Sequence, residues 1–174
     1  MRLYSDMDSA ERQFQDLVNR YSERLYWHLR TMVGSHDDAD DLLQDVFIKA
    51  WKALPGFRGD ADIFTWLWRI ATNEALGFLR RAKVRSILTF RSLDGEALSV
   101  PDTDAPLDAE QAAARLQKAI ASLPPKQRAV FHMRYYEEMA YEQISRITGT
   151  SVGALKASYH FAYEKIKQYV LEEN

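Results

Sequence analysis

Residues 141–167 read YEQISRITGTSVGALKASYHFAYEKIK, and the pattern in this stretch decides the fold of the C-terminal part of the chain. Apolar residues recur every three or four positions over residues 140–148 and 151–171, which predicts two helices. Gly149 lies between them and tolerates the left-handed backbone that often follows a helix terminus. Thr150 or Ser151 can then cap the second helix with a side-chain oxygen. A short helix, a glycine-containing turn and a longer helix form the helix-turn-helix pattern, whose second helix lies in the DNA major groove.

The second of these helices has two different faces. Leu155, Tyr159, Ala162 and Ile166 have the spacing of a stripe that faces a core. The opposite face carries small and basic residues that suit a DNA groove, and the preceding helix offers an arginine for phosphate contact. The candidate DNA contacts are Arg128, Ser151, Gly153, Lys156, Ala157 and His160. A plain helical hairpin within a bundle is the alternative.

Most of the remaining sequence is also predicted to be helical. Residues 9–33, 37–54, 61–83, 108–122 and 126–136 show helical periodicity, and no alternating strand pattern occurs. Residues 92–110 contain two prolines, a glycine, six acidic residues and no basic residue, a composition typical of a linker. We therefore predict an all-α fold of two small helical domains, 1–91 and 111–174, joined by an acidic flexible linker at 92–110.

Composition limits the class of protein. The 174 residues carry a net charge of −2 and no cysteine, so disulfides and thiolate zinc sites are excluded. We find neither a signal peptide nor an apolar run of membrane-spanning length, and we expect a cytoplasmic protein without membrane insertion. The charge is unevenly distributed. Residues 57–91 carry 7 Lys/Arg against 3 Asp/Glu, and residues 111–174 carry 9 against 6, which is compatible with local nucleic-acid patches.

The stretch FRGDADIFTWLWRIATNEALGFLRR, residues 57–81, combines aromatic rings with arginines. A helix that starts near Asp62 places Phe64, Trp68 and Phe78 on the core side and Trp66 on the outer face. The alternative for Trp66 is that it packs beneath the loop that precedes the helix. An exposed ring beside arginines can hold an unstacked base, and the polar, glycine-containing loop before the helix can bond the edge of an extruded base. The candidate nucleic-acid contacts here are Arg58, Asp60, Trp66, Arg69, Asn73, Arg80 and Arg81.

The helix predicted over residues 37–54 has an acidic face formed by Asp41, Gln44 and Asp45. One hypothesis for its N-terminal end is a metal site, because His36 is followed by four aspartates within five residues. Acidic residues in the first turn are, however, favoured by the helix dipole alone. No second ligand cluster appears elsewhere in the sequence. We therefore predict no metal and no cofactor.

Three of these stretches resemble a known family. LPPKQRAVFHMRYYEEMAYEQIS together with GTSVGALKASYHFAYEKIK is similar to the sigma-four domain of extracytoplasmic-function sigma factors, which are bacterial transcription initiation factors. DLLQDVF, residues 41–47, resembles the stretch with which sigma factors bind the clamp of RNA polymerase. Residues 57–81 resemble the segment that recognises and melts the minus-ten promoter element.

The resemblance implies a role for each candidate set. Asp41, Gln44 and Asp45 would bind basic side chains of the largest-subunit clamp of core RNA polymerase. The set from Arg58 to Arg81 would recognise the minus-ten element and help to open the DNA, and the set around Lys156 would recognise the minus-thirty-five element. The implied partners are core RNA polymerase (largest-subunit clamp and flap), promoter DNA and, as in many family members, an anti-sigma factor.

Two alternatives from other classes remain at this point. One is a helix-turn-helix regulator that acts without being a polymerase subunit. The other is a metal-dependent phosphohydrolase built on His36 and its neighbouring aspartates. The sequence contains no Ser-His-Asp, thiol or phosphate-loop pattern, so we predict that the protein is not an enzyme.

Overall fold

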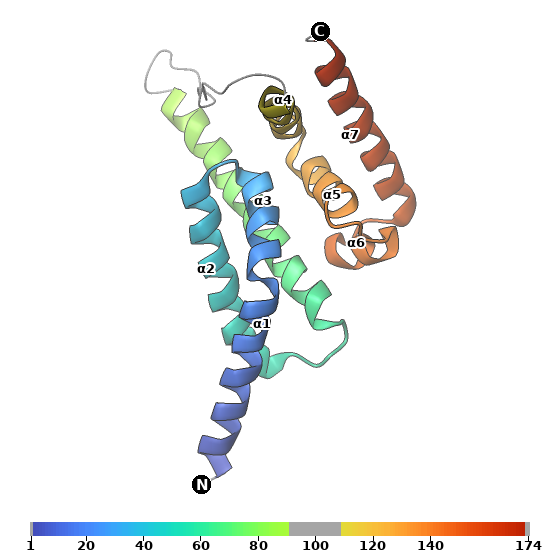
Figure 1. The fold of residues 1–174 in the computed structure, drawn as a ribbon. Helices are drawn as coiled ribbons and strands as arrows, with labels where there is room; N and C mark the ends of the chain where they lie inside the picture. Colours follow the sequence, from blue (N-terminus) through green and yellow to red (C-terminus); the bar gives the residue numbers. More distant parts are fainter. Residues whose placement is uncertain (1, 91–108, 173–174) are drawn as a thin grey trace.

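The computed structural model describes residues 2–90 and 109–172, and the secondary structure in these ranges is helical throughout (Figure 1). The first range contains α1 (Arg2–Val33), α2 (His36–Ala53), the 3₁₀ turn η1 (Leu54–Gly56) and α3 (Ile63–Phe90). The second contains α4 (Ala109–Ala121), α5 (Pro125–Tyr135), α6 (Tyr141–Thr148) and α7 (Val152–Glu172). The all-α prediction is confirmed. Of the predicted linker, only its last two residues are described, and they begin α4.

Two helices are longer than their apolar periodicity predicts. α1 begins at Arg2 instead of residue 9, and α3 continues to Phe90 instead of residue 83. Neither extension contains the glycine or proline that would end a helix. None of the helices within the described residues is long and apolar enough to cross a membrane.

The N-terminal domain, α1 to α3, packs three long helices around a shared core (Figure 1). Ser35 caps α2, since its side chain accepts a hydrogen bond from Asp38 N at 3.3 Å. Trp68 is fully buried as predicted, and Phe64 and Phe78 are half-buried against the same core. The other buried apolar residues of this domain include Leu25, Leu29, Met32, Leu42, Val46 and Leu67.

The C-terminal domain, α4 to α7, has a smaller core of its own. Within it, α7 packs against α4, α5 and α6. Of the stripe predicted on α7, Leu155, Ala162 and Ile166 are buried, and Tyr159 is half-buried. Leu155 and half-buried Tyr159 also contact the larger core that includes Trp68.

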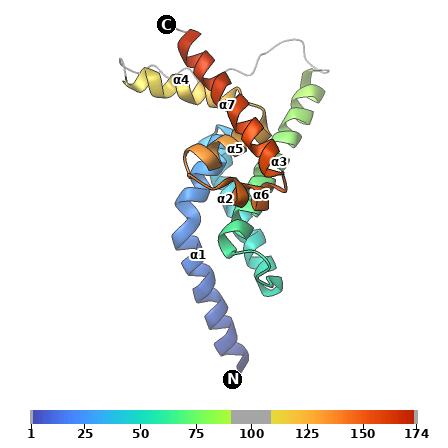
Figure 2. The ribbon, with the colours of Figure 1, turned by 90° about the vertical axis from the view of Figure 1, so that its right-hand side faces the viewer.

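The two domains pack directly against each other. α5 lies against α1, and α6 lies against α3 (Figure 2). Val130, Met133, Ile144 and Ile147 of the C-terminal domain belong to the same buried cluster as Trp68 of the N-terminal domain. The sequence left the relative placement of the domains open, and the structure places them in contact through a continuous apolar interface.

Gly149 provides a direct test of the turn between α6 and α7. Its φ of +71° is left-handed, a backbone that any residue with a Cβ adopts at a cost of about 1–2 kcal/mol. No atom lies within 4 Å of an added Cβ, so backbone strain is the only penalty. We expect Gly149→Ala to lower the free energy of unfolding in urea by about 1–2 kcal/mol. Gly153→Ala is the matched control, because Gly153 lies in helical backbone with equally open space, and it should be neutral or slightly stabilising. Equal losses of unfolding free energy at both positions would contradict this account.

Candidate functional site

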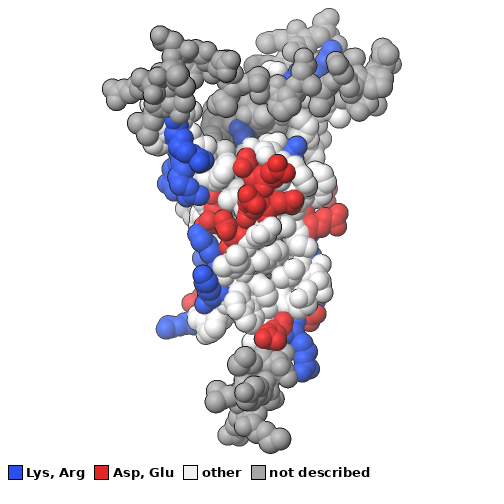
Figure 3. Space-filling model, turned by 90° about the vertical axis from the view of Figure 1, so that its left-hand side faces the viewer, with Lys and Arg blue, Asp and Glu red and all other residues white. Residues whose placement is uncertain are grey.

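The acidic face of α2 is exposed, as the sequence predicts. Leu42, Val46 and Ala50 point into the core, which turns Asp41, Gln44 and Asp45 toward solvent. Figure 3 shows acidic side chains gathered on the side of the molecule that carries α2, with Lys and Arg side chains along the neighbouring edge. This surface can bind a basic partner without any change in the fold of α2.

His36, at the start of α2, has protein partners on both ring nitrogens. Nδ1 lies 2.6 Å from the hydroxyl of Tyr26, and Nε2 lies 3.3 Å from the Asp40 carboxylate. Among residues 2–90 and 109–172, no three His, Asp or Glu side chains come together in a way that could hold a metal ion. The described residues therefore offer no support for a phosphohydrolase.

The loop before α3 is tied to the helix by Asp62. Its two carboxylate oxygens accept hydrogen bonds from Thr65 N and Thr65 Oγ1, both at 2.8 Å. These bonds lower the pKa of Asp62, so the cap stays charged. Gly59, with a φ of +74°, lets the chain reverse within this loop. The loop is thereby presented at the positive end of the α3 dipole, where anionic groups are favoured.

Trp66 lies differently from the exposed ring that the sequence predicts. It is half-buried, and its ring centroid is 5.0 Å from that of Phe57 in the loop. Helical periodicity assigned Trp66 to the outer face, whereas the alternative position beneath the loop agrees with this contact. A contact between Trp66 and DNA stays a prediction.

An open pocket of about 460 Å³ adjoins the loop. Its lining consists of Gly59, Asp60, Ala61, Asp62, Arg69 and Arg146. Arg69 Nη2 donates a hydrogen bond of 2.7 Å to the main-chain oxygen of Arg146 in α6. Two candidate residues for the minus-ten element, Asp60 and Arg69, therefore lie where the N-terminal domain meets the C-terminal domain.

The remaining candidates of the N-terminal domain are exposed. Asn73, Arg80 and Arg81 lie along α3, and Arg58 lies in the loop. Arginines can bind phosphates through two parallel hydrogen bonds, which suits a surface that follows a DNA backbone.

The helix-turn-helix prediction is confirmed in its geometry. Gly149 ends α6 in the left-handed conformation, and Ser151 Oγ accepts a hydrogen bond of 3.3 Å from Ala154 N at the start of α7. The side chains predicted to face DNA are all exposed: Ser151, Gly153, Lys156, Ala157 and His160. Lys156 Nζ lies 5.9 Å from the centroid of the Tyr141 ring on α6, close enough for a cation–π interaction that orients it.

Arg128 is placed differently from a surface phosphate ligand. Its guanidinium is half-buried and donates to the main-chain oxygens of Met32, Ala121 and Leu123. Burial lowers the pKa of this guanidinium, and three carbonyl partners compensate for the lost hydration. In this conformation Arg128 joins α5 to α1, so the predicted phosphate contact stays a prediction that would require these bonds to open.

Comparisons with known proteins cover both domains. Residues 17–85 match the family described as Sigma-70 region 2, and residues 113–166 match Sigma-70, region 4. The ECF RNA polymerase sigma-E factor of Escherichia coli (strain K12) is 32% identical over 168 residues, which cover 92% of this chain and 87% of that protein. The chain belongs to the ECF family of RNA polymerase sigma factors. A further ECF sigma factor, SigW of Bacillus subtilis (strain 168), is 29% identical over 163 residues, covering 89% of this chain and 87% of that protein.

Solved structures share the fold of this ECF sigma factor. The sigma factor RpoE in its complex with the anti-sigma factor NepR from Bartonella quintana matches with a TM-score of 0.71 and 24% identity, covering 92% of this chain and 97% of that one. CnrH in its complex with the cytosolic domain of CnrY matches with a TM-score of 0.68 and 24% identity, covering 94% and 91%. At this identity the likeness establishes the fold alone.

Membership of the family decides between the classes left open by the sequence. As an ECF sigma factor, the chain is a transcription initiation factor that acts with core RNA polymerase on promoter DNA, and it is not an enzyme. A helix-turn-helix regulator that is not a polymerase subunit is not favoured, because the match to region 2 extends over α1 to α3.

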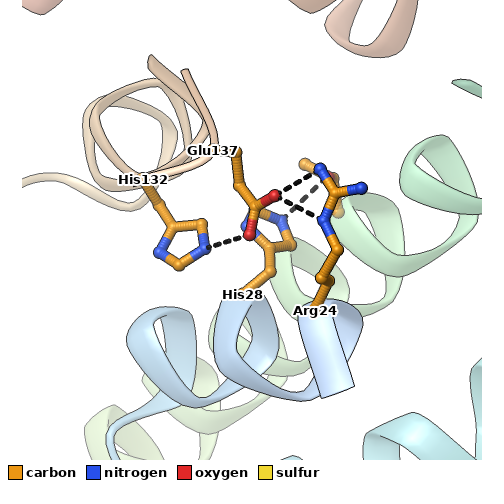
Figure 4. Close-up of polar contacts among 5 residues, drawn as sticks. Arg24, His28, His132 and Glu137 are labelled. Atoms are coloured by element: carbon orange, nitrogen blue, oxygen red, sulfur yellow. Dashed lines mark hydrogen bonds and ion pairs between the residues drawn. The ribbon is translucent and has the colours of Figure 1, made fainter. Parts of the chain in front are cut away.

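One group of residues was missed by sequence reasoning. Arg24 and His28 of α1 meet His132 of α5 and Glu137, which follows α5, at the contact between the domains (Figure 4). Arg24 and Glu137 are 113 positions apart in sequence. No local spacing or motif could have indicated that they meet.

Proposed function

We propose that the three exposed surfaces of this sigma factor divide the work of initiation. The acidic face of α2, with Asp41, Gln44 and Asp45, binds the clamp of the largest subunit of core RNA polymerase. The loop before α3 and the outer side of α3 recognise the minus-ten element and hold its opened strand. The N-terminal half of α7 enters the major groove of the minus-thirty-five element.

The observation that carries this proposal is that both regions of the family occur on one chain, with most candidate residues of each on an exposed face. Acidic side chains complement a basic partner, and basic and polar side chains complement DNA. Melting would be driven by binding energy, because captured bases offset the pairing and stacking that are lost.

Transcription in vitro tests the function as a whole. The purified chain is mixed with bacterial core RNA polymerase and a library of randomised promoters, and the transcripts are sequenced. We expect enrichment of two short elements separated by a constant spacing. Core enzyme that is active with another sigma factor, yet gives no promoter-dependent transcript with this chain, would contradict the proposal.

Lys156→Ala tests the assignment of α7. A basic side chain at a base edge is worth about 1–3 kcal/mol, so we expect about a tenfold loss of transcription from promoters that depend on the minus-thirty-five element. Affinity for core polymerase should not change. Lys167→Ala, which removes an exposed lysine near the other end of α7, is the matched control and should leave both measurements unaltered. A fall in core affinity with Lys156→Ala would refute the assignment.

The family also suggests a cellular location and a further partner. We place the protein in the cytoplasm, where RNA polymerase acts. An anti-sigma partner is also proposed, since the similar folds of RpoE and CnrH were solved with NepR and with the cytosolic domain of CnrY. Co-purification of the tagged chain from its native cells, followed by mass spectrometry, tests both.

A further inference from the structure

A charged pair joins the two domains at one end of their interface. Arg24 of α1 donates from both Nε and Nη2 to the same oxygen of Glu137, at 2.8 and 2.6 Å (Figure 4). The Glu137 side chain is only 11% exposed, so solvent screens this pair less than a surface ion pair. Loss of Arg24 would leave the Glu137 carboxylate poorly solvated, whereas the Arg24 side chain is 45% exposed.

Two imidazoles lie beside this pair, inside the interface. His28 of α1 is fully buried, with its ring centroid 4.6 Å from Trp68 of α3 and 5.1 Å from His132 of α5. Its Nε2 hydrogen bonds with Thr72 Oγ1 at 3.0 Å, while Nδ1 has no hydrogen-bond partner. His132 Nε2 lies 3.8 Å from the free oxygen of Glu137. We call Arg24, His28, His132 and Glu137 the interdomain cluster.

The contact between the domains engages part of one proposed DNA surface and leaves the other free. Arg69 and Asp60, proposed for the minus-ten element, share a pocket with Arg146 of α6, and Arg69 is hydrogen-bonded to it. Lys156 and His160, proposed for the minus-thirty-five element, remain exposed on α7.

Distance adds a second conflict with promoter binding. Elements centred at promoter positions −35 and −10 are about 25 base pairs apart, which is about 85 Å along B-DNA at about 3.4 Å per base pair. In this conformation Arg69 contacts α6, which is followed directly by α7, a helix only about 30 Å long. DNA is too stiff over 25 base pairs to bring both elements to surfaces this close.

We propose that the interdomain cluster holds the chain in a closed state that binds the minus-ten element weakly, and that acidification favours the open state. The closed state is the one described above, with α5 and α6 against α1 and α3. The claim about binding of the minus-ten element rests on the proposed function of α3. The claim that the two domains separate does not depend on it.

The direction of the pH effect follows from the groups that face His28. They are Arg24 on its own helix, Trp68 and Thr72 on α3, His132 on α5, and Glu137 beyond it. Burial, and next the charge of His132, hold the pKa of His28 well below 6.5, so the closed state contains the neutral ring. Freed from the interface, His28 regains a pKa of about 6.5. Closure is therefore fully stable above about pH 6.5 and is lost as the pH falls below it.

Protonation of Glu137 also favours the open state, at a more acidic pH than protonation of His28. Burial alone would raise the pKa of Glu137, but the His132 ring, whose Nε2 lies 3.8 Å from the carboxylate, and the hydrogen bonds and charge of Arg24 lower it overall. Its carboxylate thus holds Arg24 while His28 titrates, and its later protonation would further weaken closure.

The test measures the distance between the domains in the full-length chain. The sequence contains no cysteine, so spin labels can be attached at Lys52→Cys and Lys167→Cys, two exposed positions on α2 and α7. Pulsed electron spin resonance then gives the closed and open populations. We expect Arg24→Glu or Glu137→Arg to raise the open-to-closed ratio about tenfold, and the combined exchange to restore it. Lys49→Glu, which breaks the Lys49–Glu74 pair within the N-terminal domain, is the control and should leave the ratio unchanged.

The same labels test the pH dependence. Below about pH 6.5 the open-to-closed ratio should rise by up to about tenfold per pH unit. His28→Gln keeps an amide that can bond Thr72 and should flatten this profile, with circular dichroism used to verify that the helices persist. If the distance between the labels changes neither with pH nor with charge reversal, the proposed role of the interdomain cluster is refuted. It is also refuted if the combined exchange does not reverse the effect of the single substitutions.

A binding measurement separates this inference from the proposed function. The probe is a fluorescent single-stranded DNA that carries the minus-ten sequence selected in the transcription experiment. If reversal at Glu137 opens the chain, its affinity for this probe should rise about tenfold, in line with the open population. Opening without a gain in affinity would refute the role of α3 in the minus-ten contact. Failure to open would refute the interdomain cluster alone.

Discussion

Trp68→Ala is expected to lower the free energy of unfolding by about 3–5 kcal/mol, the usual range when a buried tryptophan is truncated. The ring is fully buried. It lies 5.5 Å from Phe64 on its own helix, 4.6 Å from His28 on α1 and 6.4 Å from His132 on α5, measured between centroids. Its removal opens a cavity where both domains meet, and the surrounding helices can fill only part of it.

Denaturation in urea at neutral pH measures this loss. Trp27→Ala is the matched control, because Trp27 is 54% exposed and should change stability by no more than about 0.5–1 kcal/mol. Because Trp68 belongs to the continuous interface, a single unfolding transition should shift as a whole. Equal effects of the two substitutions would show that the position of Trp68 at the centre of the core is wrong.

Asp41→Arg combined with Asp45→Arg should weaken binding to core RNA polymerase by about 100-fold. Both carboxylates are exposed on α2, so reversal costs the fold little, while each new arginine faces a basic partner with the wrong sign. Titration of labelled core enzyme with the variant gives the affinity, and circular dichroism gives the helicity. The change should become smaller as salt is raised, since the effect is electrostatic.

A matched double reversal separates this local effect from the change in net charge. Asp16→Arg with Glu23→Arg alters two exposed acids of α1 and changes the net charge equally. We expect it to change core affinity less than about threefold. If both pairs weaken binding alike, the assigned face of α2 is incorrect.

Much of the local structure could be predicted from sequence. The helix-turn-helix follows from an apolar stripe that includes Leu155 and Ile166, a glycine that accepts positive φ, and a serine that can cap the next helix. The exposed face of α2 follows from the same periodicity. In each case the signal lies within about one or two helical turns, and apolar faces must be buried whatever they pack against.

Other residues could not be placed in this way. Trp66 has the spacing of an outer-face residue, yet the loop before it brings Phe57 against its ring. Arg128 has the charge of a phosphate ligand, yet carbonyl groups that include Met32 O, 96 positions away, accept its hydrogen bonds. Both outcomes depend on which neighbours the folded chain supplies.

The sequence by itself determined the helices, their caps, their apolar faces and, through its motifs, the family to which the chain belongs. Only the tertiary structure decided that one buried cluster spans both domains, that Arg69 is bonded to Arg146, and that His28 and Glu137 lie within one cluster. The physical reason is how far apart in the sequence the interacting residues lie. Helices and caps arise from interactions between residues a few positions apart. The interdomain hydrogen bonds of Arg69 and Arg24 join residues 77 and 113 positions apart, and they exist only once the helices have packed.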